Sequence, residues 1–317
     1  VELMTGLLFV VAFMQNFEDI GHNKNRVSSL GLGLGQLGNA VSIGVMGTFV
    51  VGGSLVIWGI SDKSLALVLG AVIFIILALP FLLQKSDSAA PSGVGVGKLF
   101  SIREFLKRVL DNKKLLYYLL GYMFVADSVT TLQIYMTLYL KNVFDFTDKM
   151  SSFAGVISLG MLFATCMLLG SLAHKMVDKN KSLGIAGIIY VGTFLLFGLT
   201  PNVPFLAYLC LALAGVAYGL FFPLARSLYS DIVPKEEQAE HFSFFIIFER
   251  AAAIIGPVVW VIVYELLRSY SVEFRYRMNI MVLSLIAMLG LYLIKKSFIF
   301  ENPQLAPKGS SGKIDFV

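Results

Sequence analysis

The feature that most constrains this chain is the recurrence of apolar runs long enough to cross a lipid bilayer. A helical crossing takes about 20 mostly apolar residues, because the hydrocarbon core is about 30 Å thick and a helix rises about 1.5 Å per residue. Runs of this kind fall at 38–58, 65–83, 115–139, 153–173, 183–199, 205–224, 244–266 and 278–294. Only 14% of the residues are charged, against roughly 25% in soluble domains. The sequence therefore predicts an all-α, polytopic transmembrane helical bundle.

A shorter apolar run, residues 3–14, opens the chain. It is too short to cross a bilayer alone, and it lacks the basic start of a signal peptide. The chain also begins with Val1 rather than Met. We interpret the run as the end of a further span, and we expect the chain to be a fragment that lacks the preceding N-terminal spans.

The basic residues alternate between the two sides of the predicted bundle. If residues 3–14 end in the cytoplasm, most of the Lys and Arg residues lie on the inner side. The outer loops then hold only Lys63, Lys141, Lys149, Arg268, Arg275 and Arg277. This positive-inside bias supports the orientation, and anionic lipid rather than nucleic acid accounts for the net charge of +5. The plasma membrane of a prokaryote and a vacuolar or lysosomal membrane of a eukaryote both fit such a protein.

The longest inner segment divides the chain. Residues 84–114 begin with a Ser-, Gly- and Pro-rich linker and continue as a predicted amphipathic surface helix. Residues 1–83 would then be the end of one transmembrane half, residues 115–295 a complete six-span half, and residues 296–317 a cytoplasmic tail. We expect a protein of two six-span halves, of which this chain holds the second complete and the last spans of the first.

Several chemistries find no support in the sequence. Cys166 and Cys210 lie inside apolar runs, which argues against a disulfide framework and a thiolate zinc site, and the three histidines are scattered. The Gly-rich residues 31–38 are no nucleotide loop, because no strand precedes them and no Lys-Ser/Thr follows. No nucleophile with a positioned base is evident. We expect no cofactor, no metal and no enzymatic activity.

Asp127 lies midway along the run 115–139, where a carboxylate costs on the order of 3 kcal/mol unless it faces a cavity or is neutralised. Thr130 and Thr131 follow it on a helix. The residue would suit proton coupling or cation binding, and the alternative is a structural carboxyl bonded to neighbouring helices. Tyr135, two turns beyond Asp127, would line the same cavity or anchor the membrane interface.

Glu249 and Arg250 are adjacent, so on one helix they point about 100° apart and do not simply pair with each other. Arg250 would suit the bidentate binding of a substrate carboxylate. The alternative is an ion pair with Asp127 or another acid that only locks helices together. Glu249 has the same two interpretations.

Glycine and proline positions suggest moving parts. Gly31 and Gly35, with Gly38, would let helices approach closely enough to slide, although static packing explains them equally well. Gly256-Pro257 interrupts the run 244–266 and predicts either a hinge for gating or a fixed bend.

The stretch RSLYSDIVPKEEQAEHFSFFIIFERAAAIIGP, residues 226–257, resembles the signature between the tenth and eleventh spans of the vacuole-effluxer branch of the major facilitator superfamily, the autophagy-related protein 22 family. The matching positions are Arg226-Ser227-Leu228-Tyr229, Asp231, Val233, Pro234, Glu240, Phe242 and Gly256-Pro257. RVSSLGLGLGQLG, residues 26–38, is similar to the start of that family's fifth span. Asp127-Ser128-Val129 stands where the family tends to carry Asp-Gly-Val.

The resemblance has departures. In the inner loop GSLAHKMVDKN, residues 170–180, His174 stands where the superfamily has an acid, Lys175 replaces an Arg and Val177 replaces a Gly. Asp178 would supply the acid from a shifted position. Gln36 and Glu249 also differ from the usual residues. Gating or helix packing at the inner face is expected from Gly170, Asp178, Arg226 and Asp231.

The resemblance implies a major facilitator-type bundle that works by alternating access. The cavity would lie between the halves, with Asp127, Arg250 and Glu249 facing it. The implied function is export of a small solute, with amino acids as the first substrate to consider and protons as a coupling ion. The alternatives are a non-transporting scaffold or receptor acting through residues 84–114, and an inactive truncated product.

Overall fold

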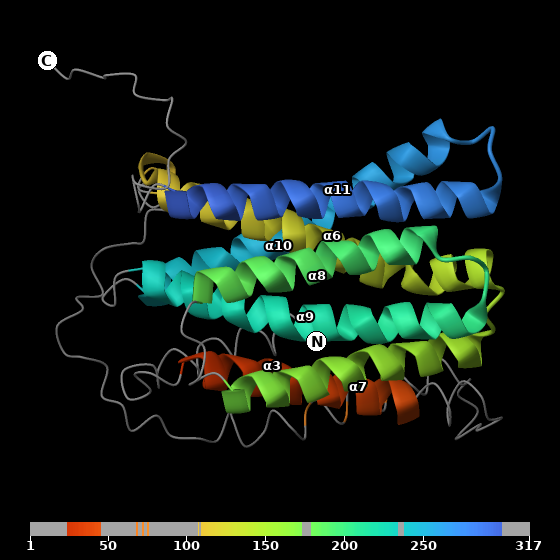
Figure 1. Cartoon of the computed structure of the whole chain (residues 1–317), viewed down its shortest axis with the longest axis horizontal. Helices are drawn as coiled ribbons and strands as arrows, with labels where there is room; N and C mark the ends of the chain where they lie inside the picture. The colour runs from red at the N-terminus through yellow and green to blue at the C-terminus, as the bar shows by residue number, and fades with distance from the viewer. Residues whose placement is uncertain are drawn as a thin grey trace, which may run out of the picture.

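The structure, a computed structural model, describes residues 24–45, 109–172, 179–233 and 238–299, and the single residues 68, 72, 75 and 107. Within these ranges all regular structure is helical, as Figure 1 shows. The helices are α3 (Lys24–Val45), α6 (Lys113–Phe144), α7 (Asp148–Leu172), α8 (Lys179–Leu199), α9 (Pro204–Ile232), α10 (Gln238–Leu266) and α11 (Val272–Ile299). The expected all-α helical bundle is confirmed.

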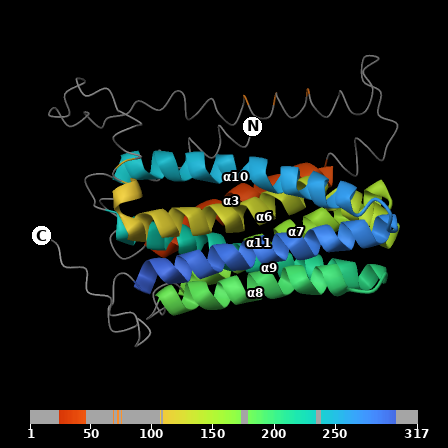
Figure 2. The same cartoon turned by 90° about the horizontal axis from the view of Figure 1, so that it is seen from above.

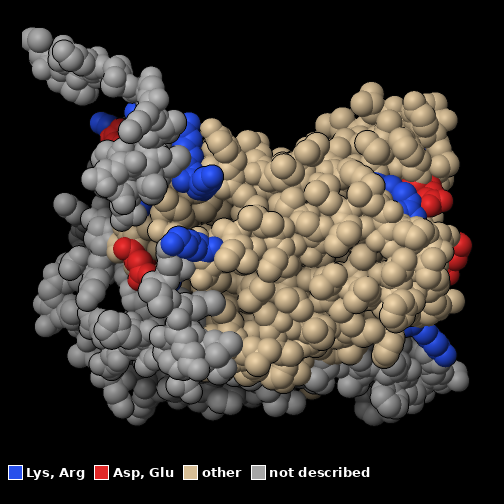
Figure 3. Space-filling model, viewed as in Figure 1, with Lys and Arg blue, Asp and Glu red and all other residues tan. Residues whose placement is uncertain are grey.

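Six of these helices are long and apolar enough to cross a membrane, and they match the six spans expected after residue 114. On the face drawn in Figure 3, Lys, Arg, Asp and Glu of the described residues lie near the two ends of the bundle, and the surface between them is uncharged. This distribution suits a bilayer, whose hydrocarbon core excludes unpaired charge.

The helices are longer than the apolar runs that predict them. α10 begins at Gln238 and α11 at Val272, each six residues ahead of its run, so Arg275 and Arg277 lie in a helix and not in the expected outer loop. α3 begins at Lys24, well before the expected start at residue 38. Hydropathy measures how far a helix stays apolar, and a helix continues into the polar headgroup region beyond that point.

α6 packs against α11 and α10 and lies between them in Figure 2. Asn112 caps its start, where the side chain accepts a hydrogen bond from the Leu115 N–H at 3.2 Å. α6 contacts α11 at Gly121 and Gly290. A Cβ atom on either glycine would lie 2.6 Å from the carbonyl oxygen of the other. This crossing therefore requires both glycines.

Small residues also bring α7 and α9 together. A Cβ on Gly219 of α9 would lie 2.9 Å from the Leu162 carbonyl oxygen of α7, and one on Gly215 would overlap the Ser158 carbonyl. Gly215-x-x-x-Gly219 is a small-residue motif of the kind that brings membrane helices into contact.

Two of the three glycines singled out on α3, Gly35 and Gly38, do not make such a contact with the described part of the chain. A Cβ on Gly35 or Gly38 would meet nothing there within 4 Å, and Gly31 is half-buried. Gly33 instead contacts α7, where its Cβ would lie 2.9 Å from Cβ of Cys166.

Three expectations from the sequence fall largely outside the described residues. These are the spans before residue 84, apart from α3, the linker with most of the amphipathic helix in residues 84–114, and the tail after α11. The expected boundary at residue 115 lies two residues inside α6, which begins at Lys113.

Candidate functional site

The candidate site lies where the middle of α6 meets α10, at the buried carboxyl of Asp127. Its side chain is fully buried. Oδ1 accepts a hydrogen bond from the backbone N–H of Gly256 at 2.7 Å. Oδ2 has no hydrogen-bond partner among the described residues. A buried oxygen without a partner is costly in a membrane protein, and intramembrane acids mark ion or substrate pathways by default.

Thr131 lies one turn beyond Asp127 on the same face of α6. It is also fully buried, and its hydroxyl has no hydrogen-bond partner within the described ranges. The neighbouring Thr130 differs, because its hydroxyl donates to the Ala126 carbonyl of its own helix at 3.0 Å. The hydroxyl of Thr131 is therefore the one available to the site.

Gly256 brings the backbone of α10 against both side chains. A Cβ atom there would lie 2.8 Å from each Asp127 carboxyl oxygen and would overlap the Thr131 hydroxyl. Only glycine fits at this position. Pro257 follows inside α10, and because proline has no N–H, the Ala253 carbonyl lacks its usual helical donor.

One turn further, the two helices meet through aromatic rings. Tyr135 of α6 stacks on Trp260 of α10, with ring centroids 4.5 Å apart and planes at 1°. Trp260 is buried and Tyr135 is half-buried. The stack holds the ring of Tyr135 against α10 beside the expected site.

Two turns before Gly256, Glu249 of α10 is paired with Arg226 of α9. The Arg226 Nη2 lies 3.3 Å from both carboxyl oxygens of Glu249. The Tyr122 hydroxyl of α6 donates to Glu249 Oε2 at 2.9 Å. Glu249 thus ties three helices together, which was the structural alternative considered for it. Its substrate role remains a prediction.

Arg250 does not pair with Asp127, so that proposed ion pair is wrong: the described bonding of Asp127 is to the Gly256 N–H. The side chain of Arg250 is half-buried, and its Nε is buried without a hydrogen-bond partner among the described residues. A guanidinium N–H in this state can donate a hydrogen bond to an anionic group.

The expected inner-face residues are partly tied together. Asp231 at the end of α9 forms a salt bridge with Lys179 at the start of α8, at 2.5 Å. Gly170 lies in α7, and Asp178 lies outside the described residues. The shifted-acid prediction for Asp178 therefore stays a prediction.

Sequence reasoning missed a contact created by a second internal proline. Pro223 of α9 leaves the Gly219 carbonyl without its helical donor. The Cys166 thiol of α7 points to that carbonyl at 3.7 Å. The proline four residues after a glycine was the available signal, but the partner cysteine depends on how α7 packs.

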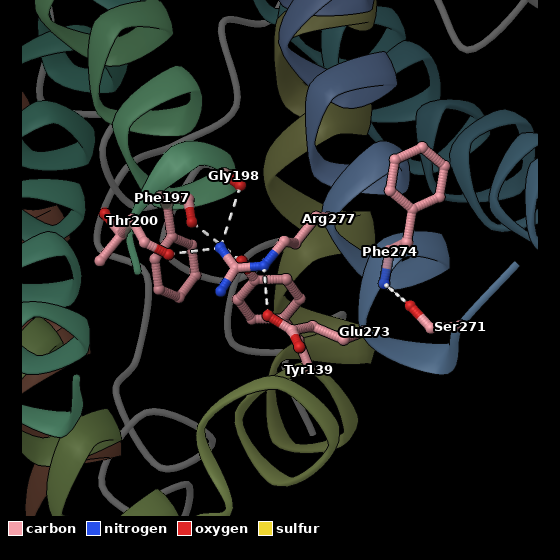
Figure 4. Close-up of polar contacts among 8 residues, drawn as sticks. All are labelled: Tyr139, Phe197, Gly198, Thr200, Ser271, Glu273, Phe274 and Arg277. Carbon is pink, nitrogen blue, oxygen red and sulfur yellow. Dashed lines mark hydrogen bonds and ion pairs between the residues drawn. The ribbon is translucent and has the colours of Figure 1, made fainter. Parts of the chain in front are cut away.

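Sequence reasoning also missed a tight polar cluster where α8 ends and α11 begins, shown in Figure 4. Arg277 of α11 donates from Nη1 to the carbonyls of Gly198 and Thr200, at the end of α8. Its Nε donates to Glu273 at 2.9 Å. The Tyr139 hydroxyl donates to the Phe197 carbonyl at 2.8 Å. These donors satisfy carbonyls that a helix end leaves open, with a cation at the negative end of the dipole.

The six apolar helices and the buried polar site between them define a polytopic α-helical membrane protein. The chain belongs to the vacuole effluxer Atg22-like family, whose model matches residues 15–297.

Among curated proteins, the chain is similar to autophagy-related protein 22 of Kluyveromyces lactis, with 25% identity over 50% of this chain and 34% of that protein. It is 26% identical to a multi-drug resistance efflux pump PmrA homolog of Lactococcus lactis, over 72% of this chain and 56% of the pump. It is 23% identical to a Na(+), Li(+), K(+)/H(+) antiporter of Planococcus maritimus, over 57% of this chain and 42% of the antiporter. The chain thus spans about a third to just over half of these relatives.

Proposed function

We propose that this protein is a secondary active transporter that exports a small solute by alternating access, coupled to protons through Asp127. The observation that carries the proposal is the fully buried carboxyl in the middle of α6, with one oxygen on the Gly256 N–H and the other without a partner. Family membership and the relatives named as an efflux pump and an antiporter support it.

The surroundings of Asp127 suit a group that changes its protonation state. From α10 it meets the Gly256 N–H, a neutral donor. The nearest charged residues on α10, Glu249 and Arg250, lie about two turns before Gly256, and Glu249 is paired with Arg226 of α9. Since no Lys or Arg of the described residues is bonded to it, the carboxylate bears the cost of a buried charge, and a bound proton removes that cost.

The substrate class that we consider first is amino acids. Arg250 is the candidate for the solute carboxylate, because its Nε is buried and has no partner in the described part of the chain. A guanidinium binds a carboxylate through two parallel hydrogen bonds, which gives both affinity and orientation.

The test is solute flux into proteoliposomes under an imposed pH gradient, with labelled amino acids as the first panel. Asp127→Asn should lose the response to the pH gradient. Asp145→Asn is the matched control, because it removes the same charge from an exposed position at the end of the same helix, in a left-handed conformation that asparagine tolerates.

Each result has a clear meaning. Loss of gradient-driven flux in Asp127→Asn, with Asp145→Asn unchanged, supports proton coupling through Asp127. Gradient-driven flux that survives in Asp127→Asn overturns the coupling mechanism. Absence of flux in the unaltered protein across a broad solute panel would overturn transport itself and favour a scaffold or receptor.

A further inference from the structure

We propose that the facing turns of α6 and α10 form a binding site for a monovalent alkali cation, with Asp127 Oδ2 and Thr131 Oγ1 as ligands. The inference deepens the proposed function, because the coupling carboxyl would then bind a metal cation that competes with the proton. It concerns binding alone, so it is testable without any solute flux.

The first argument is the convergence of two unpartnered oxygens. Asp127 Oδ2 and Thr131 Oγ1 are both fully buried, and neither has a hydrogen-bond partner among the described residues. Both lie against Gly256, because a Cβ there would contact each of them. Two orphaned oxygens one helical turn apart, facing the same backbone, are the start of an oxygen coordination shell.

The second argument is the backbone of α10. Pro257 leaves the Ala253 carbonyl without a helical N–H donor, in the turn that leads to Gly256. Carbonyl oxygens released at an interrupted membrane helix are suited to binding Na⁺. This carbonyl would add a third oxygen to the carboxyl and the hydroxyl.

The third argument concerns the charge of the bound cation. Carboxylate, hydroxyl and carbonyl oxygens are hard ligands, which favour hard cations. The site offers one negative charge, which balances a monovalent cation, whereas a divalent cation would leave a net charge inside the bilayer. In the described part of the chain, no group of three or more His, Cys, Asp or Glu residues could hold a metal ion.

The stack of Tyr135 on Trp260 provides a reporter one turn from the site. The sequence holds only two tryptophans, so Trp58→Phe leaves Trp260 as the single indole. In this background, the purified protein is titrated with NaCl, LiCl or KCl, with choline chloride holding the ionic strength constant. Equilibrium binding of ²²Na⁺ to the same protein gives a second readout that does not depend on fluorescence.

Thr131→Val and Thr130→Val are the matched pair, because the two threonines are neighbours on one helix and only the Thr130 hydroxyl is bonded to its own helix. We expect Thr131→Val to weaken cation binding about tenfold or more, as loss of a supporting ligand does. Thr130→Val should bind as the unaltered protein does, Thr131→Ser should restore binding, and Asp127→Asn should abolish it.

Saturable binding of Na⁺ or Li⁺ with this order of variants supports the site. Absence of saturable ²²Na⁺ binding, or equal affinity in Thr131→Val and Thr130→Val, overturns it. Transport without cation binding would leave the proposed function standing and remove only this inference. Cation binding without transport would do the opposite.

Discussion

The contact of α7 with α9 and the contact of α6 with α10 are both built on a glycine and an internal proline. They differ in whether the buried polar atoms beside the glycine have hydrogen-bond partners. We call them the α7–α9 seam and the α6–α10 seam. Each holds a glycine at a close approach and a proline inside one helix. In the α7–α9 seam, the carbonyl released by Pro223 faces the Cys166 thiol. In the α6–α10 seam, Asp127 and Thr131 keep oxygens without partners.

The difference separates packing from function. A buried polar atom without a partner lowers stability, so a seam that serves only packing should contain none. At the Gly219 carbonyl, which Pro223 leaves without its helical donor, the α7–α9 seam meets that condition through the Cys166 thiol. The α6–α10 seam departs from it at the Asp127 carboxyl and the Thr131 hydroxyl, which is what a ligand site requires.

The largest expected effect is at the α7–α9 seam. Gly215→Ala would press a methyl group into the Ser158 carbonyl, and backbone atoms have little freedom to move away. We expect stability to fall by about 3 kcal/mol, measured as the thermal midpoint and the monodisperse fraction in detergent. Gly192→Ala is the control, since its Cβ meets nothing described within 4 Å. Equal behaviour of the two variants would contradict the close approach.

The next effect is at the pair of Glu249 with Arg226, two turns before Gly256 on α10. Glu249→Gln removes the charge that faces Arg226 and weakens the bond from Tyr122. Full burial would make this loss larger, but both charged side chains are about one-fifth exposed, so we expect about 2 kcal/mol. A double-mutant cycle with Arg226→Gln should show coupling. Additive losses would mean that the pair contributes nothing.

A change of opposite sign is expected at Asp127. Asn keeps an oxygen for the Gly256 N–H and removes the unpaired charge. Thermal stability of Asp127→Asn should therefore stay equal or rise by about 1 kcal/mol, although pH-driven flux is lost. A clear loss of stability would show that the carboxyl is structural, and the contrast between the two seams would fail.

The smallest effect is at Cys166. A thiol is a weak donor, so Cys166→Ala should cost less than about 1 kcal/mol, and Cys166→Ser, which keeps a donor, should cost less still. Thermal midpoints of the two variants test this order. A large loss in both would mean that packing against Gly33, rather than the bond to Gly219, is what Cys166 provides.

The sequence predicts the helices well and their contacts poorly. Hydropathy locates all six spans after residue 114 because apolar length is a property of the local sequence. It also singles out Asp127, since a carboxyl at mid-span has few explanations. Glu249 and Arg250 are adjacent in sequence, yet the partner of Glu249 is Arg226, 23 residues away. That choice depends on how α9 and α10 cross, which no local pattern records.

The cluster around Arg277 has a mechanical consequence. One guanidinium joins the start of α11 to the end of α8 through backbone carbonyls, which no change of rotamer on α8 can release. At the opposite end, α8 and α9 are joined by the exposed pair Lys179 and Asp231, which water and salt can loosen. One end of the bundle is thus held by bonds to backbone carbonyls and the other by an exposed ion pair. Any rocking of its helices should therefore pivot about the Arg277 end.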